Sequence, residues 1–143
     1  MKRIALGFAL ATIAGAATAG EAITYGFDGS FDDATFAVES AIMGQGLVIE
    51  YVSHVGDMLN RTGADVGSNV KIYDNARIFL FCSAVVSREV MEADPGNLVH
   101  CPYSIYVAER EGQVTLGHRD FPEGPMDKVE GLLAGIAKEA GGQ

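Results

Sequence analysis

The sequence predicts an α+β fold, in which a small mixed β-sheet is packed with three to four helices in a single domain. Two observations predict it. Short apolar segments with strand character alternate along the chain with segments that have the apolar spacing of amphipathic helices. The 143-residue chain also contains no repeat, no low-complexity segment and no linker that would divide it.

The first predicted elements are a short edge strand at residues 22–25 and the helix that follows it. Ser30 is the expected N-cap of this helix, because Ser30 and Asp33 have the spacing of a capping box, with Asp in place of the usual Glu or Gln. Gly44 and Gly46 are expected to end the helix, since glycine is common just beyond a helix C-terminus.

Residues 47–53 form the second predicted strand, and a short helix follows at residues 55–62. Alternation along the strand predicts two faces, one formed by Leu47, Ile49 and Tyr51 and the other by Val48, Glu50 and Val52. Residues 63–75 are rich in Gly, Asp, Asn and Ser, and they are therefore expected to form a connection.

The third predicted strand, residues 78–82, is apolar at every position. Such a run is typical of a central strand that is covered on both faces. A helix is expected at residues 83–93, and the turn signal at residues 94–97 ends it.

Two strands and one helix complete the predicted domain. The strands, at residues 103–108 and 113–118, are joined by a tight hairpin turn at Glu111-Gly112. Pro125 has the position of an early helical residue, and the last helix is expected to run from there to about Ala140.

The N-terminal segment has the pattern of a secretory signal peptide. Lys2 and Arg3 precede an uncharged apolar run, and Ala17-Thr18-Ala19 fits the small-x-small cleavage pattern. An uncleaved anchor is the alternative, but the run is short for a membrane span. We therefore expect a signal peptide at residues 1–19, a single α+β domain at residues 20–143, and a periplasmic location.

The charge balance is strongly acidic. The chain has ten Lys and Arg against nineteen Asp and Glu, which gives a formal net charge of −9. A chain of this charge is repelled by phosphate backbones and by anionic lipid surfaces. We therefore expect no nucleic-acid partner, and no membrane association after the signal is cleaved.

Cys82 and Cys101 are the only cysteines, and both lie in the part of the chain expected to be exported. An even pair of cysteines in an oxidising compartment is first interpreted as a disulfide candidate. Each lies at the end or the entrance of a predicted strand, so the two sulfurs would meet if these ends share an edge of the sheet.

Several of these segments together resemble the family known as the domain of unknown function 302. The resemblance covers about residues 31–119. The segments that carry it are the strand at 46–49 that leads to His54, the apolar strand ending in Cys82, the helix after it, residues 92–95, and residues 101–107 with the hairpin that follows. It implies a small α+β fold and a homodimer, and the family assigns no reaction.

Four side chains are the candidate site residues, namely Cys82, Cys101, His100 and His54. Thiolate and imidazole are the natural protein ligands of Cu(I) and Zn(II). Copper and zinc are therefore possible cofactors, and haem is a third because Cys101-Pro102 is a short haem-ligand motif. No C-x-x-C or H-x-x-x-H spacing occurs, so the metal interpretation competes with a structural disulfide, with two inert thiols and with a reversible redox pair.

Two other polar groups allow a functional and a plain interpretation. Glu50 could orient His54 for acid–base work or metal binding, but a solvated strand end is the simpler explanation. His118 shares a strand face with Val114 and Leu116 and is expected to be a hydrogen-bonded strand-end residue and not a ligand.

The first functional hypothesis is a redox-active or soft-metal-binding accessory protein that uses the cysteine pair. The alternative is a non-catalytic ligand-binding or protein-interaction module with a structural disulfide. Enzymatic activity stays open, and we lean against it because no complete nucleophile–base set can be named.

Overall fold

The computed structural model describes residues 21–143. In chain order the elements are β1 (Ala22–Phe27), α1 (Phe31–Gly44), β2 (Val48–Ser53), α2 (Val55–Thr62), η1 (Ala64–Val66), β3 (Asn75–Cys82), α3 (Ala84–Ala93), η2 (Pro95–His100), β4 (Tyr103–Arg110), β5 (Gln113–Arg119) and α4 (Asp127–Glu139). The predicted signal peptide, residues 1–19, lies outside the described residues. No helix within residues 21–143 has both the length and the apolar character needed to cross a membrane.

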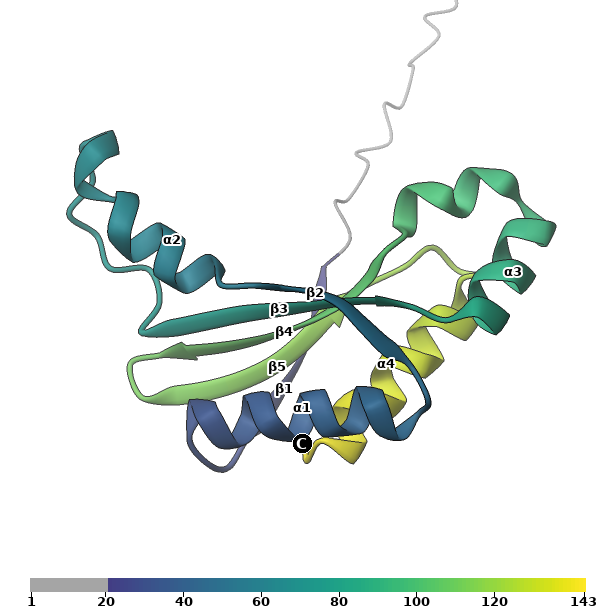
Figure 1. Cartoon of the computed structure of the whole chain (residues 1–143), viewed down its shortest axis with the longest axis horizontal. Coiled ribbons are helices and arrows are strands. Elements are labelled where there is room, and N and C mark those ends of the chain that lie inside the picture. Colours follow the sequence, from purple (N-terminus) through teal and green to yellow (C-terminus); the bar gives the residue numbers. More distant parts are fainter. Residues whose placement is uncertain (1–20) are drawn as a thin grey trace, which may run out of the picture.

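The five strands form one sheet in the order β1-β5-β4-β3-β2 (Figure 1). The α+β fold is confirmed, but every pair of neighbouring strands is antiparallel, so the sheet is not mixed. The reason is that α3 and η2 turn the chain back beside β3 and do not carry it across the sheet, so β4 returns antiparallel to β3.

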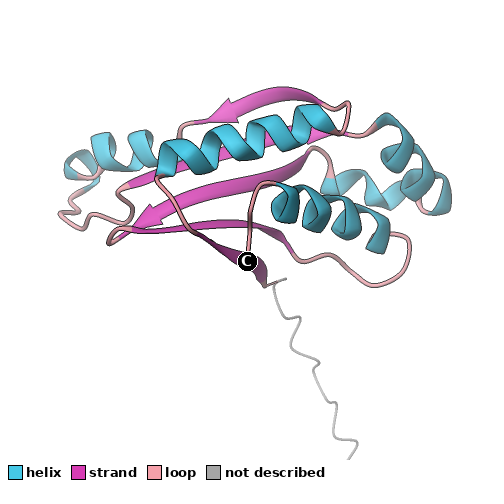
Figure 2. Ribbon diagram, turned by 90° about the horizontal axis from the view of Figure 1, so that it is seen from below, coloured by secondary structure: helices cyan, strands magenta, loops and turns pink. Residues whose placement is uncertain are grey.

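Helices α1 and α4 lie on one face of the sheet, and the hydrophobic core is formed between them and the strands (Figure 2). Alternate strand residues supply one side of this core, and the apolar stripes of the two helices supply the other. The most deeply buried members are Phe81, Ile105, Val107 and Leu116 from the strands, and Val38, Ile42, Leu133 and Ile136 from the helices. Burial of each such side chain stabilises the fold by about 1.5–3 kcal/mol.

Helix α1 begins with the predicted capping box. The Ser30 hydroxyl oxygen accepts a hydrogen bond from the Asp33 backbone N–H at 3.1 Å, and the Asp33 carboxylate accepts from the Ser30 backbone N–H at 3.2 Å. The Ser30 hydroxyl also donates to this carboxylate at 2.6 Å. These bonds to Ser30 lower the pKa of Asp33.

Strand β2 departs from strict alternation. The register with β3 shifts between Ile49 and Tyr51, so Glu50 is an extra residue in a β-bulge. Beyond the bulge the faces exchange, and Val52 packs against the core while Tyr51 is 64% exposed. The predicted face of Leu47, Ile49 and Tyr51 is therefore wrong at Tyr51.

The second face of the sheet, which we call the open face, is only partly covered. Helix α2 contacts it at β3, where Gly56 lies directly against the backbone of Ala76. Along β3 the core side is fully buried at Phe81, but Ile78 and Leu80 on the open face are only half-buried. Strand β3 is central as predicted, but it is not fully covered on both faces.

The β4–β5 hairpin turns at the predicted dipeptide. Glu111 and Gly112 have φ values of 53° and 76°, so both adopt the left-handed conformation that a two-residue hairpin turn requires. The Asp74 carboxylate accepts the Glu111 backbone N–H at 2.7 Å and fixes the turn against the loop before β3. The last helix, α4, begins at Asp127, two residues later than Pro125 suggested.

Candidate functional site

The structure brings Cys82 and Cys101 together. Cys82 is the last residue of β3, and Cys101 lies just before β4. Because the two strands are antiparallel, with Phe81 opposite Tyr103, the end of one strand meets the entrance of the other. The two Sγ atoms are 3.8 Å apart, with the Cys82 thiol donating to the Cys101 sulfur.

This contact is not the predicted disulfide. A disulfide has an S–S bond of about 2.05 Å, whereas the 3.8 Å separation of Cys82 and Cys101 is that of two thiols in contact. Both cysteines are free, and both are partly exposed. The pair therefore contributes no covalent cross-link to this structure.

Two hydroxyl groups complete the surroundings of the thiol pair. The Ser87 Oγ atom of α3 lies 3.7 Å from the Cys101 Sγ atom, and Ser87 donates to the Tyr103 hydroxyl at 3.1 Å. Since the single hydroxyl hydrogen of Ser87 is used toward Tyr103, the Cys101 thiol is the donor to Ser87. The result is a chain of donors that runs from Cys82 through Cys101 and Ser87 to Tyr103.

This environment raises the pKa values of Cys82 and Tyr103. The pKa of the Cys82 thiol is raised to about 11, mainly by burial, and the hydrogen bond and charge of Cys101 and the charge of Glu50 act in the same direction. Burial is also the main cause that raises the pKa of Tyr103 to about 12, against a lowering effect of the Ser87 hydrogen bond. At neutral pH Cys82 is therefore a neutral thiol and Tyr103 a neutral phenol.

His54 does not join the cysteines. In the β2–β3 register Val48 is opposite Cys82, and His54 follows the other end of β2. A strand of this length separates its two ends by about 20 Å. His54 instead precedes α2, where its Nδ1 atom is 3.7 Å from the Asp57 carboxylate, with both side chains mostly exposed.

His100 is next to Cys101 in the chain but faces elsewhere. Its ring packs edge-on against Phe121, with 5.5 Å between the ring centroids. Its Nδ1 atom is buried, and no described residue makes a hydrogen bond to it. Over residues 21–143, no three His, Cys, Asp or Glu side chains form a group that could hold a metal ion, so the predicted four-ligand set is not assembled.

The other predicted polar groups have ordinary structural surroundings. His118 is buried, and its Nδ1 atom is 2.9 Å from the Arg119 carbonyl oxygen. Because a carbonyl only accepts, Nδ1 carries the proton, and Nε2 accepts from the Tyr25 hydroxyl at 3.3 Å. His118 is thus a satisfied strand-end residue, as expected. Glu50 lies in the bulge and makes no ion pair with His54 among those the structure describes.

Exposed apolar side chains flank the thiol pair. Val48, opposite Cys82 in the sheet, is 75% exposed, and Val85, at the start of α3, is 69% exposed. Leu98 and Val99, shortly before Cys101, are exposed as well. A patch of exposed apolar side chains is typical of a surface that contacts another protein.

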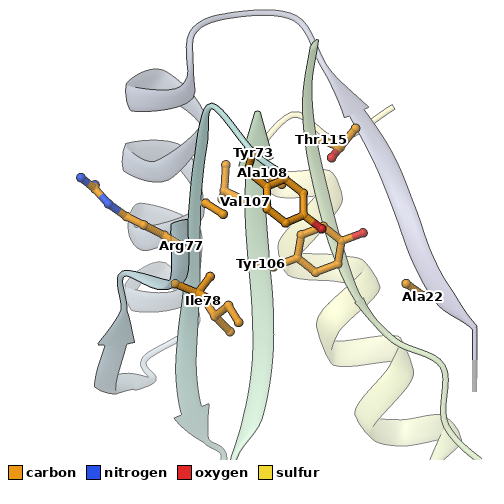
Figure 3. Close-up of a pocket in the computed structure, with 10 residues that line it drawn as sticks. Ala22, Tyr73, Arg77, Ile78, Tyr106, Val107, Ala108 and Thr115 are labelled. Carbon is orange, nitrogen blue, oxygen red and sulfur yellow. The ribbon is translucent and has the colours of Figure 1, made fainter. Parts of the chain in front are cut away.

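The structure shows a second site that the four candidate site residues do not include, a hollow of about 420 Å³ on the open face (Figure 3). We call it the tyrosine hollow, because the rings of Tyr73 and Tyr106 line it. The signal that could have revealed it is the alternation of small and aromatic residues in β4, where Tyr106 and Ala108 share the face opposite the core.

Comparison with known proteins gives a family and a fold. The family model described as "Domain of unknown function DUF302" matches residues 23–140. The crystal structure of an uncharacterised conserved DUF302 protein from Bacillus stearothermophilus is similar with a TM-score of 0.60 and 14% sequence identity, over 83% of this chain and 91% of that one. A search of curated proteins finds no match.

Proposed function

The chain belongs to the DUF302 family, a domain of unknown function, and we propose that its functional centre is the pair Cys82 and Cys101, which works as a reversible dithiol–disulfide couple. The observation that carries the proposal is the 3.8 Å contact between the two Sγ atoms. From this contact a disulfide needs only a local side-chain movement. Both residues are partly exposed, so the sulfurs can be reached from outside.

The proposed partner is a protein that presents a disulfide and contacts the exposed apolar border. The Cys101 thiolate attacks one partner sulfur, forms a mixed disulfide and releases the other partner sulfur as a thiolate. The Cys82 thiolate then attacks the Cys101 sulfur and releases the second partner sulfur. The partner gains two electrons, and the two protons lost from Cys82 and Cys101 end on its two thiols.

Cys101 is assigned as the attacking residue because a hydroxyl group lies beside its sulfur. The Ser87 oxygen, 3.7 Å away, accepts from the Cys101 thiol and can reverse its role to donate to the thiolate. Cys82 is the resolving residue in this scheme. Its pKa of about 11 keeps it protonated at neutral pH, so Cys101 is the residue that reacts first.

The setting that we propose for this chemistry is based on the sequence of residues 1–19. In our proposal residues 1–19 direct export, and residues 20–143 act in the periplasm, an oxidising compartment in which dithiol–disulfide exchange takes place. We also propose a homodimer, because the outer edge of β2 has no strand neighbour among the described residues and Val48 and Tyr51 are exposed beside it.

A soft-metal site is the second candidate, and the sulfur separation favours it. Two thiolates bound to one metal at about 2.3 Å with a tetrahedral angle are about 3.8 Å apart. Cys82 and Cys101 have this separation. Thiolates suit Cu(I), which prefers soft ligands, and the other two positions of such a tetrahedral site would be open to ligands from outside the pair.

A redox titration tests the first candidate. Wild type, Cys82→Ser and Cys101→Ser are equilibrated in buffers of graded reduced and oxidised glutathione, the free thiols are labelled, and the chains are weighed by mass spectrometry. Wild type should lose both labels together, with one midpoint, and regain them on reduction. Each single variant should give only a mixed disulfide with glutathione. Two thiols that stay labelled in the most oxidising buffer would refute the proposal.

Competition with a chromophoric chelator tests the second. The reduced wild type should withdraw one Cu(I) ion per chain from its bicinchoninate complex, whereas either Ser variant should withdraw none. Retention of all copper by the chelator would remove the metal candidate and leave the redox candidate unaffected.

A further inference from the structure

The tyrosine hollow is built by two aligned rows of residues on the open face. Its floor is a row of small side chains, because Ala76 of β3 is opposite Ala108 of β4, and Ala108 is opposite Thr115 of β5. The neighbouring row holds larger residues, with Ile78 opposite Tyr106. The step in side-chain size between these two rows makes one wall.

The opposite wall comes from outside the sheet. Val55, at the start of α2, and Tyr73, in the loop before β3, both line the hollow. Helix α2 is held close to the sheet by Gly56, where an added methyl group would lie 2.5 Å from the Ala76 backbone nitrogen. The hollow is thus set by the fold and does not result from one loosely packed side chain.

The aromatic wall is fixed in position. The ring of Tyr106 lies across Gly117 of β5, and its hydroxyl is hydrogen-bonded to Thr24 Oγ1 of β1 at 2.8 Å. A ring held at both its face and its hydroxyl presents a constant surface for stacking. Both Tyr73 and Tyr106 place their rings in the hollow (Figure 3).

No charged group of residues 21–143 is directed into the hollow. Arg77 lies at its edge, but its side chain extends away from the hollow (Figure 3), and its guanidinium lies 5.5 Å from the centroid of the Phe31 ring on the core side. The polar groups that remain are the hydroxyls of Tyr73, Tyr106 and Thr115. With a chain net charge of −9, an organic anion is disfavoured.

We propose that the tyrosine hollow is a binding site for a small, uncharged aromatic molecule. Its volume of about 420 Å³ is within the range of small-molecule sites in proteins, and its lining combines apolar and aromatic surface with a few hydroxyls, as such sites do. The ligand stacks on the tyrosine rings, rests on Ala76 and Ala108, and makes a hydrogen bond to a hydroxyl of the lining. This site is separate from the cysteine pair.

The test uses N-phenyl-1-naphthylamine, an uncharged aromatic dye that fluoresces in apolar surroundings. Wild type should bind one dye per chain saturably. Ala108→Leu, which fills the floor, should weaken dye binding at least tenfold. If this variant does not fold, Thr115→Leu replaces it, because Thr115 is half-exposed and a larger side chain there disturbs the core less. Leu80→Phe adds volume on the same face outside the lining of the hollow, so this control should bind like wild type, as should Cys82→Ser.

Three outcomes would overturn the proposal. The first is that wild type shows no saturable dye binding, and the second is that the filled variants bind the dye as well as wild type does. The third is that wild type excludes the dye and sediments as a dimer, and that Ala108→Leu dissociates this dimer. The last result would identify the hollow as a contact between two copies of the chain. Since Cys82→Ser is expected to bind dye normally, failure here is distinct from failure of the thiol proposal.

Discussion

The phenol ring of Tyr106 lies directly across Gly117 on the neighbouring strand and reaches Thr24 on the strand beyond, with 2.8 Å between the two hydroxyl oxygens. One side chain of β4 thus spans β5 and contacts β1. Gly117 has no side chain, and this is what leaves room for the ring. The relationship ties three strands together and yields the first prediction.

Gly117→Ala should displace the Tyr106 ring and break its hydrogen bond to Thr24, because the new methyl group would overlap the ring. Overpacking of this kind costs about 1–3 kcal/mol, which urea unfolding would measure. Gly131→Ala is the matched control, since nothing lies within 4 Å of that position in α4. The control should be neutral or stabilising, and equal stability of the two variants would contradict the packing described.

Gly56→Ala should push α2 away from the sheet. The methyl group would lie 2.5 Å from the Ala76 backbone nitrogen, and a strand backbone cannot move aside as a flexible side chain can. We expect faster amide hydrogen exchange in α2 and an altered affinity of the tyrosine hollow for the naphthylamine dye. Gly135→Ala, also an open position, should change neither quantity. Unchanged exchange in α2 would show that the contact is not tight.

Cys82 should react slowly with iodoacetamide at neutral pH. Its pKa of about 11, raised mainly by burial, lies above the ordinary thiol value, and each unit lowers the thiolate fraction tenfold. Peptide mapping should show alkylation that keeps increasing up to about pH 11 in the folded chain. In urea the increase should level off near the ordinary thiol pKa of about 8.5. A plateau at that lower pH in the folded chain would refute the assigned environment.

The same pKa shift predicts how stability depends on alkaline pH. The folded-state pKa of Cys82 is raised, so its contribution to stability is complete below the unfolded-state value, and it is lost as pH rises toward about 11. The melting temperature should therefore fall over this interval. Cys82→Ala should show a smaller fall than wild type, and identical slopes for the two proteins would contradict this prediction.

Much of the fold could be predicted because local chemistry determines it. The capping box at Ser30 and Asp33 and the hairpin dipeptide at Glu111 and Gly112 each act over a few residues, and both appear as expected. The bulge at Glu50 could not be predicted, because it depends on how β2 is aligned with β3 and not on the sequence of β2 alone.

The candidate site was predictable only in part. Strand ends can be inferred from apolar runs, and this is why Cys82 and Cys101 could be considered together. Whether His54 joined them depended on the direction in which β2 runs beside β3, and alternation carries no information about direction. The tyrosine hollow depends on the alignment of Ala76, Ala108 and Thr115 across three strands, which is a property of register and not of any one segment.

The pairing of β1 with β5 has a consequence for the order in which the domain is assembled. The strand neighbour of Ile23 is His118, so the first strand of the described residues pairs with the last one. Until β5 has been synthesised, β1 has no strand to pair with, and a chain that ends before β5 cannot complete its sheet. Folding of this domain is therefore expected to be late and concerted, and a chain released before β5 is made should stay open to proteases.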